Sequence, residues 1–220
     1  MESKSLLSLE KPEFAVNPLS VVPKIDIPTH VPPAAVLDPA RLKALYETGL
    51  MDSDAEDCFD RLTRIATTVF KAPVALVSLV DDKRQFFKSQ CGLPESWKNR
   101  RETPVSQSFC QYVVAEGQPL VIPDSADNAL VCNNEIIQLL DVVAYLGVPI
   151  KSSDGKHTFG SFCVIDNVPR DWTDADVALL TDLAQSVVTE IEVRSYSKAR
   201  EEACLRFLTR FGVRADFDLG

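Results

Sequence analysis

Hydrophobic positions along the chain repeat with two periods, and each period predicts one kind of secondary structure. Residues 38–49 carry apolar side chains at helical spacing and end in Gly49, a residue typical of helix ends. Residues 53–72 predict a second helix, which begins with Ser53 and Glu56 at the spacing of a capping box. The apolar face of this second helix consists of Phe59, Leu62, Ile65, Ala66, Val69 and Phe70.

Three further segments show a helical period. Residues 106–118 and 134–143 each predict a short helix. In the second of these, four residues are expected on the buried side: Ile136, Ile137, Leu139 and Leu140. Residues 173–195 predict a long helix with Thr173 as its N-cap and Asp176 three residues later, after which the apolar register breaks.

Continuous apolar runs predict the strands. Residues 74–82 form an uninterrupted β-rich run, which is typical of a strand buried on both faces. Residues 84–92 follow after a very short turn, so the two runs predict an antiparallel hairpin. Residues 119–124 predict another strand, and residues 144–167 predict a second hairpin that turns at residues 153–155.

The order of these elements predicts an α+β domain with a largely antiparallel sheet flanked by helices. Residues 1–37 differ, because seven of the 14 prolines fall within the first 39 residues. Proline fixes φ and removes a backbone donor, so we expect an extended or disordered arm there. Its apolar residues could lie across a surface or a partner: Val21, Val22, Ile25 and Ile27. Residues 38–195 then form the domain, and residues 196–220 a C-terminal helical extension.

Composition and charge exclude several functions. The formal net charge of −9 argues against nucleic acid, since phosphate binding requires clustered Lys and Arg. No apolar run reaches the roughly 20 residues of a membrane span, and the first residues lack a secretory signal pattern. We therefore expect a cytoplasmic protein with no membrane partner, whose six cysteines are reduced thiols. The spacing of these cysteines and of the two histidines predicts no metal site.

Three stretches, taken in order, resemble successive parts of one family. They read FDRLTRIATTVFKAPVALVSLVDDKRQFFKSQCGL, TPVSQSFCQYVVAEGQPLVIPDSADN and YLGVPIKSSDGKHTFGSFCVIDNVPRDWTDADVALLTDLA. Together they are similar to a bacterial GAF domain over roughly residues 38–195. The resemblance implies a central antiparallel sheet of five or six strands with helices on both faces. It also implies that the first two helices and the last pack on one face, while loops and short helices form a pocket on the other.

The resemblance further implies a non-enzymatic sensory or regulatory module in signal transduction. Such modules bind a small molecule, pass a signal to a protein partner or effector, and commonly dimerise through terminal helices. Val187, Ile191 and the helix near Ala44 would suit the seam of a homodimer, or would simply cover the sheet. The chain carries no kinase or cyclase motif, so it either acts on a partner or belongs to a larger protein. Another possibility is an interaction platform that binds no ligand.

The candidate ligand-binding residues are those that the resemblance places around the pocket: Phe87, Phe109, Cys110, Tyr112, Asp124 and Tyr145. Of these, Asp124 either holds a polar group of a ligand or caps its own turn. No catalytic residues are predicted. Cys163 has no basic partner in the local sequence, so we expect it in the core.

Two ligand classes of the family are disfavoured, so the cofactor stays unknown. The segment NNEIIQLLD lacks the Lys and Phe of the cyclic-nucleotide signature, and Cys110 is followed by Gln111 rather than by the histidine usual for a covalent bilin. The alternative function is a thiol redox enzyme or switch, similar to the methionine sulfoxide reductases of this fold. It would require Cys91, Cys110 and Cys132 to approach one another.

Overall fold

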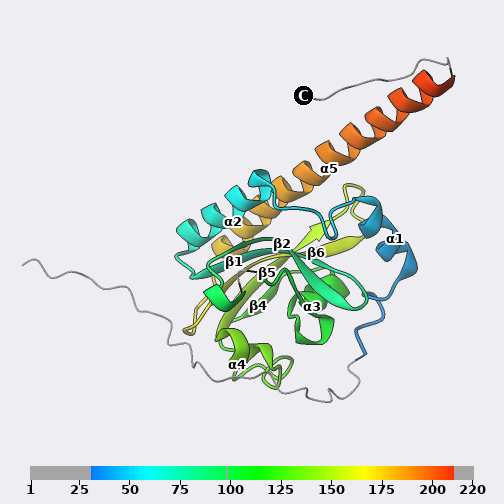
Figure 1. Ribbon diagram of the computed structural model, residues 1–220. Helices are drawn as coiled ribbons and strands as arrows, with labels where there is room; N and C mark the ends of the chain where they lie inside the picture. Colours follow the sequence, from blue (N-terminus) through cyan, green and yellow to red (C-terminus); the bar gives the residue numbers. More distant parts are fainter. Residues whose placement is uncertain (1–30, 98, 211–220) are drawn as a thin grey trace, which may run out of the picture. The chain divides into compact units, whose positions relative to one another are not determined.

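A six-stranded antiparallel sheet forms the centre of the computed structural model, which describes residues 31–97 and 99–210 (Figure 1). Within these residues the strand order is β3-β2-β1-β6-β5-β4. The strands are β1 (Val74–Val80), β2 (Arg84–Cys91), β3 (Glu102–Pro104), β4 (Leu120–Ile122), β5 (Ala144–Lys151) and β6 (Thr158–Asp166). Both predicted hairpins are confirmed, because β1 pairs with β2 and β5 pairs with β6 in antiparallel register.

Helices cover both faces of the sheet, as predicted. Figure 1 shows α2 and α5 above the sheet, and α3 and α4 below it. The helices are α1 (Pro39–Glu47), α2 (Asp57–Phe70), α3 (Cys110–Glu116), α4 (Ile136–Leu140) and α5 (Asp174–Arg210), with short 3-10 turns η1 (Glu95–Trp97) and η2 (Val105–Gln107). The side chains of α1, α2 and α5 pack into one hydrophobic cluster, and those of α3 and α4 pack into another. The fold is therefore α+β, with one core on each side of the sheet.

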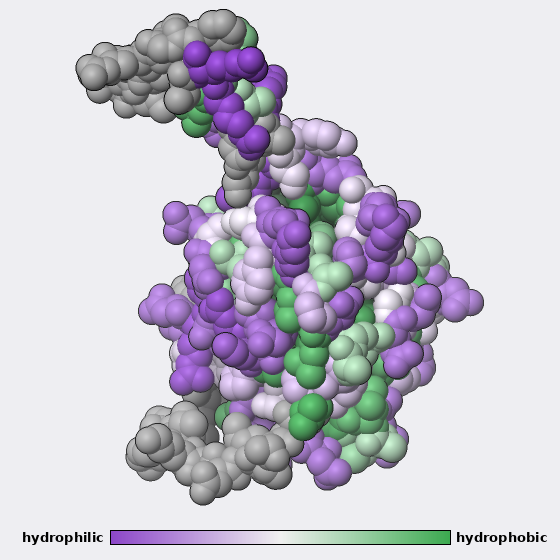
Figure 2. Space-filling model, turned by 90° about the vertical axis from the view of Figure 1, so that its right-hand side faces the viewer, coloured by the Kyte–Doolittle hydropathy of each residue, from purple (hydrophilic) through white to green (hydrophobic). Residues whose placement is uncertain are grey.

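Strand β1 is buried along its whole length because both cores contact it. Ala75, Val77 and Leu79 belong to the core under α2 and α5, whereas Val74 and Leu76 belong to the core over α3. Such two-sided burial accounts for the uninterrupted apolar run in the sequence. The face of the molecule in Figure 2 is mostly hydrophilic, with hydrophobic residues in a band that runs down the middle and widens toward the lower right.

The start of α2 corrects the predicted capping box. The helix begins at Asp57, and Ser53 lies four residues before it. The Ser53 hydroxyl donates to the carbonyl of Leu50 and accepts a bond from Lys88, while the Glu56 carboxylate forms ion pairs with Lys88 and Arg194. Both side chains thus bind β2 or α5 rather than the first turn of α2.

Two predicted apolar helix faces are too wide. On α2, Ile65 and Val69 are 39% and 49% exposed, because the packed face is centred on Phe59, Thr63, Ala66 and Phe70. On α4, Leu139 is 42% exposed, and of the four apolar side chains only that of Ile136 is buried. A helix of five residues has too few turns to bury all four apolar side chains against one sheet.

Helix α5 begins as predicted and runs further than its apolar pattern suggests. Thr173 and Asp176 form the expected reciprocal cap: the Thr173 N–H donates to the carboxylate, and the Asp176 N–H donates to the Thr173 hydroxyl. The helix continues through residue 210, so the boundary drawn at residue 195 falls inside it. Val187 and Ile191 are buried against the sheet, which leaves them unavailable to a dimer seam.

The Pro-rich arm falls almost entirely outside the described residues. These exclude residues 1–30, and with them Val21, Val22, Ile25 and Ile27. Of the arm, the structure describes residues 31–37, and among these Val36 is buried in the core over α3.

Candidate functional site

A small cavity lies between the sheet and α3 and α4, in the core opposite α2 and α5. Its volume is about 30 Å³, which is enough for a water-sized molecule and about a tenth of a usual site for an organic ligand. Strands β1, β2, β5 and β6 provide the floor, and α3 and α4 the cover. The lining residues include Leu76, Gln85, Phe87, Phe109, Cys110, Leu140, Val142, Tyr145, Cys163 and Ile165.

The structure brings four of the six candidate ligand-binding residues together. Phe87, Phe109, Cys110 and Tyr145 all line the cavity, and the rings of Phe109 and Tyr145 meet edge to face with centroids 5.5 Å apart. Such aromatic pairs fix each other's orientation beyond simple burial.

The other two candidates lie elsewhere. Tyr112 is half-buried on α3 and packs against the edge of the same core, outside the cavity lining. Asp124 follows β4, and its carboxylate accepts a bond from the N–H of Ala126 at 2.9 Å. It therefore caps its own turn, the alternative that the sequence had left open for it.

Hydroxyl and thiol groups form a polar cluster in the floor of the cavity, beside apolar side chains. The Tyr145 hydroxyl lies 3.4 Å from the Cys110 sulfur and 3.3 Å from the Ser161 hydroxyl. Cys163 pairs with Gly147 of β5, over which the Tyr145 hydroxyl lies, and its side chain lines the cavity together with that of Cys110. Tyr145, Cys110 and Cys163 are each at most 2% exposed. The two thiols of this polar cluster are the chemically reactive groups of the cavity.

The two buried thiols differ in acidity. The pKa of Cys110 is lowered to about 7, first because Cys163 donates a hydrogen bond to its sulfur, and next because Tyr145, Ser78 and Ser161 can donate to it, against the effect of burial. The pKa of Cys163 is raised well above its usual value by this same bond and by burial. Burial also raises the pKa of Tyr145. Cys110 is thus the group in the cluster that ionises first.

The predicted redox site requires Cys91, Cys110 and Cys132 to approach one another, and this prediction is wrong. Cys91 lies on the other side of the sheet, 3.7 Å from the Thr67 hydroxyl of α2, and Cys132 is exposed in a loop. The reason for the position of Cys91 is a bulge: Val77 pairs with Ser89 and Ser78 with Phe87, which leaves Lys88 as an extra residue. From Phe87, simple alternation would put Cys91 in the cavity, and the bulge moves it to the opposite face.

Sequence reasoning placed Cys163 correctly in the core but missed its partner. Phe162 and Val164 point into the core under α2 and α5, and Cys163 between them points into the cavity. The alternation of β6 was the available signal. It puts Cys163 on the face of Tyr145, above which the short helix holds Cys110.

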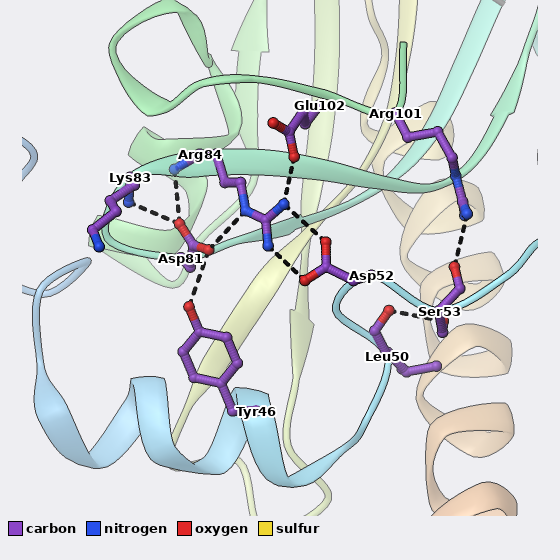
Figure 3. Close-up of polar contacts among 9 residues, drawn as sticks. All are labelled: Tyr46, Leu50, Asp52, Ser53, Asp81, Lys83, Arg84, Arg101 and Glu102. Atoms are coloured by element: carbon purple, nitrogen blue, oxygen red, sulfur yellow. Dashed lines mark hydrogen bonds and ion pairs between the residues drawn. The ribbon is translucent and has the colours of Figure 1, made fainter. Parts of the chain in front are cut away.

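A second polar cluster ties the loop before α2 to the β1–β2 hairpin (Figure 3). The Arg84 guanidinium donates to both carboxylate oxygens of Asp52, at 2.8 and 2.7 Å, and pairs with Asp81 and Glu102. Tyr46 of α1 donates to Asp81 at 3.1 Å. Because Arg84 pairs with all three carboxylates, the cluster holds these segments together.

Two negative findings apply to residues 31–97 and 99–210. Their His, Cys, Asp and Glu side chains form no group of three that could hold a metal ion. None of their helices combines the length and the apolar character needed to cross a membrane.

The structure is a small α+β domain with a cavity on one face of the sheet and a long helix on the other. The chain belongs to the GAF domain family, which matches residues 54–191. This confirms the resemblance in the sequence.

The similar proteins differ in function. A cyclic di-GMP phosphodiesterase of Pseudomonas aeruginosa is 30% identical over 162 residues, which are 73% of this chain and 27% of that protein. This chain therefore spans about a quarter of that relative. Among solved structures, the GAF domain of an Acinetobacter phosphoenolpyruvate-protein phosphotransferase has a TM-score of 0.54 at 15% identity, over 74% of this chain and 99% of that one. The free methionine-R-sulfoxide reductase of Neisseria meningitidis has a TM-score of 0.52 at 17% identity, over 72% and 89%.

Proposed function

We propose that this chain is a non-enzymatic regulatory GAF module, with the cavity over β5 and β6 as its input site and α5 as its output element. One observation carries the proposal. Strand β6 supplies Cys163 to the cavity lining and then leads, through residues 167–173, directly into α5. A ligand that moves this strand therefore acts on the helix that continues from it.

The connection between β6 and α5 is held firmly. Arg170 pairs with Asp166 at 2.9 Å and donates to the carbonyl of Phe70, and the Trp172 ring N–H donates to the carbonyl of Ile122 at 3.3 Å. With the cap at Thr173, these bonds leave the turn little freedom to absorb a shift. A displacement of β6 is then passed to α5 instead of being lost in the loop.

A second contact supports the same direction of signalling. Phe87 lines the cavity, and its neighbour Lys88 extends from the opposite face of the sheet to the Glu56 carboxylate. The Glu56 carboxylate also binds Arg194 of α5. Cavity and output helix are thus joined through adjacent residues of β2 and one shared carboxylate.

The size and lining of the cavity favour a small ligand. Phe87, Leu140, Val142 and Ile165 present apolar surface, while Tyr145 offers a hydroxyl. A volume of about 30 Å³ suits a molecule of a few atoms, and a cyclic nucleotide or bilin would require α3 and α4 to move. This supports the same exclusion that the missing signature residues suggested.

For the partner, we propose an effector of the kind represented by the Pseudomonas relative, a cyclic di-GMP phosphodiesterase. The part of α5 beyond Arg194 would reach this effector, and two copies of the module would pair along it. Val193 and Tyr196 support the pairing, since they are 56% and 76% exposed on the helix.

Native mass spectrometry of the full chain, purified without denaturation, tests the input site. We expect a small-molecule adduct that is released on unfolding, and slower hydrogen exchange in residues 174–195 of the loaded form. Leu140→Trp, at the cavity, should abolish the adduct, while Leu139→Trp on the exposed side of α4 should retain it. A chain without an adduct, or equal loading of both variants, contradicts the proposal.

A further inference from the structure

We propose that Cys110 and Cys163 form a peroxide-sensitive dithiol, which closes to an intramolecular disulfide between α3 and β6. The inference concerns the chemistry of the cavity floor and does not depend on the ligand or effector proposed above. Cys110 is the first residue of α3 and Cys163 lies in the middle of β6, and both side chains line the same small cavity. The Tyr145 hydroxyl lies 3.4 Å from the Cys110 sulfur and over Gly147, the residue of β5 that pairs with Cys163.

The surroundings assign different roles to the two sulfurs. The Cys110 sulfur faces the Tyr145 hydroxyl at 3.4 Å, and the side chains of Cys163, Ser78 and Ser161 act with it to lower the pKa of Cys110. These donors stabilise a thiolate, the form that attacks an oxidant. The raised pKa of Cys163 keeps its proton in place, and Cys163 lines the same cavity as Cys110, as a resolving thiol must.

The reaction balances with one hydroperoxide as oxidant. The Cys110 thiolate attacks the peroxide oxygen, so that an S–O bond forms, the O–O bond breaks and the hydroxide takes up a proton to leave as water. The Cys163 sulfur then attacks the sulfenic sulfur of Cys110. The S–S bond forms, the S–O bond breaks, and the second water carries away the oxygen and the proton of Cys163. Two thiols are oxidised and one peroxide is reduced to two waters.

The cavity determines which oxidants can reach the pair. Both cysteines line it, and its volume of about 30 Å³ accommodates a water-sized molecule. Hydrogen peroxide is only slightly larger, whereas a tripeptide disulfide such as oxidised glutathione does not fit. Cys132 and Cys204, in contrast, are exposed and open to both reagents. The small volume of the cavity thus makes the pair selective for a small peroxide.

The disulfide would change the element that leads to α5. It would fix α3 to β6, the strand that continues into α5. It would also convert the Cys110 thiol, the partner of the Tyr145 hydroxyl, into a disulfide sulfur. Oxidation of the pair is therefore a covalent input at the position where a ligand would act.

The test uses the full chain with Cys132→Ser and Cys204→Ser, so that exposed thiols do not interfere. The reduced protein is treated with hydrogen peroxide, blocked with N-ethylmaleimide, digested and mapped by mass spectrometry. We expect one peptide pair joined through Cys110 and Cys163, which dithiothreitol separates. Oxidised glutathione at the same concentration should leave both residues as thiols.

Single variants separate the two roles, with circular dichroism as the check on folding. In Cys163→Ala, dimedone should trap Cys110 as a sulfenic acid, whereas in Cys110→Ala, Cys163 should stay reduced. If either variant fails to fold, the disulfide map of the parent chain decides alone. The proposal is overturned if both residues stay reduced in peroxide, if Cys110 joins another cysteine, or if oxidised glutathione acts equally well.

Discussion

Gly147 lies directly beneath the ring of Tyr145, the residue that precedes it by two positions on β5. A Cβ added at Gly147 would come within 2.2 Å of the Tyr145 hydroxyl oxygen and 2.5 Å of the ring carbon that bears it. The missing side chain is what lets the tyrosine lie along its own strand, with its hydroxyl between Cys110 and Ser161. The polar floor of the cavity therefore depends on a glycine that makes none of its hydrogen bonds.

Gly147→Ala should displace the Tyr145 ring and break the polar cluster. Because the added methyl meets a buried ring rather than a flexible chain end, we expect a loss of about 1–3 kcal/mol in unfolding free energy. Urea denaturation measures this. Tyr145→Phe is the matched comparison, since it removes the hydroxyl, leaves the ring in place and should cost only about 1 kcal/mol. Equal stability of Gly147→Ala and the parent would show that the ring position is not fixed by this contact.

Much of the fold follows from the sequence because burial on both sides leaves a strong pattern. Strands β1 and β6 are buried along their whole length, and their apolar runs predicted them. Strand β3 was not predicted, because three residues that include an exposed Glu102 carry no periodic signal. Ile65 and Val69 misled the prediction for α2, since an apolar residue beside the packed face looks like a member of it.

The buried ion pair between Lys88 and Glu56 should respond unequally to loss of either partner. The Lys88 side chain is fully buried and Glu56 is about a third exposed, with their charged atoms 2.5 Å apart. Glu56→Ala leaves a buried ammonium without its carboxylate and should cost about 3–5 kcal/mol. Lys88→Met leaves Glu56 paired with Arg194 and should be close to neutral.

Urea denaturation of the two variants and of the double variant tests this asymmetry. The double variant should recover most of the stability that Glu56→Ala loses, because no unpaired charge remains in the core. Equal losses in both single variants would contradict the argument from desolvation.

The bond to Arg84 should make part of the stability sensitive to acid. Arg84 donates to Asp52 and thereby lowers the pKa of this carboxyl from its ordinary value of 3.8. A lowered pKa in the folded state stabilises the protein above pH 3.8 and loses this effect as the pH falls through the lowered value. Because the Asp52 side chain is 62% exposed, we expect only about 0.5 kcal/mol from it.

Asp52→Asn should therefore lower the unfolding free energy at pH 7 and have a smaller effect near pH 2. Asparagine also tolerates the left-handed backbone of this residue, with φ of 61°, so strain does not confound the comparison. Asp54→Asn, in the same loop and exposed, controls for the loss of one negative charge. A difference between Asp52→Asn and the parent that is constant with pH would refute the linkage.

The candidate site could be predicted only in part, for a reason visible in β2. The family resemblance located Phe109, Cys110 and Tyr145 around the cavity, because their elements are set by order along the chain. The side of the sheet on which Cys91 lies depends on the bulge at Lys88, which only the pairing with β1 reveals. Likewise, the cavity brings together Cys110 and Cys163, which lie 53 positions apart in the chain, beyond the reach of any local pattern.

Thr173, which caps α5, and Thr189 within the helix offer a matched test of how firmly the start of α5 is held. Thr173 lies at the N-terminus, where its hydroxyl accepts the N–H of Asp176 at 3.1 Å. Thr189 is exposed within the helix and donates to the carbonyl of Gln185. Thr173→Ala should cost about 1 kcal/mol, because a helix N–H loses its partner, whereas Thr189→Ala should be neutral or slightly stabilising, since alanine has the higher helix propensity. Thermal denaturation measures both, and hydrogen exchange in residues 174–180 should rise only in Thr173→Ala. If exchange rises equally in both variants, the cap does not fix the start of α5, and the turn after β6 is a weaker connection than its bonds suggest.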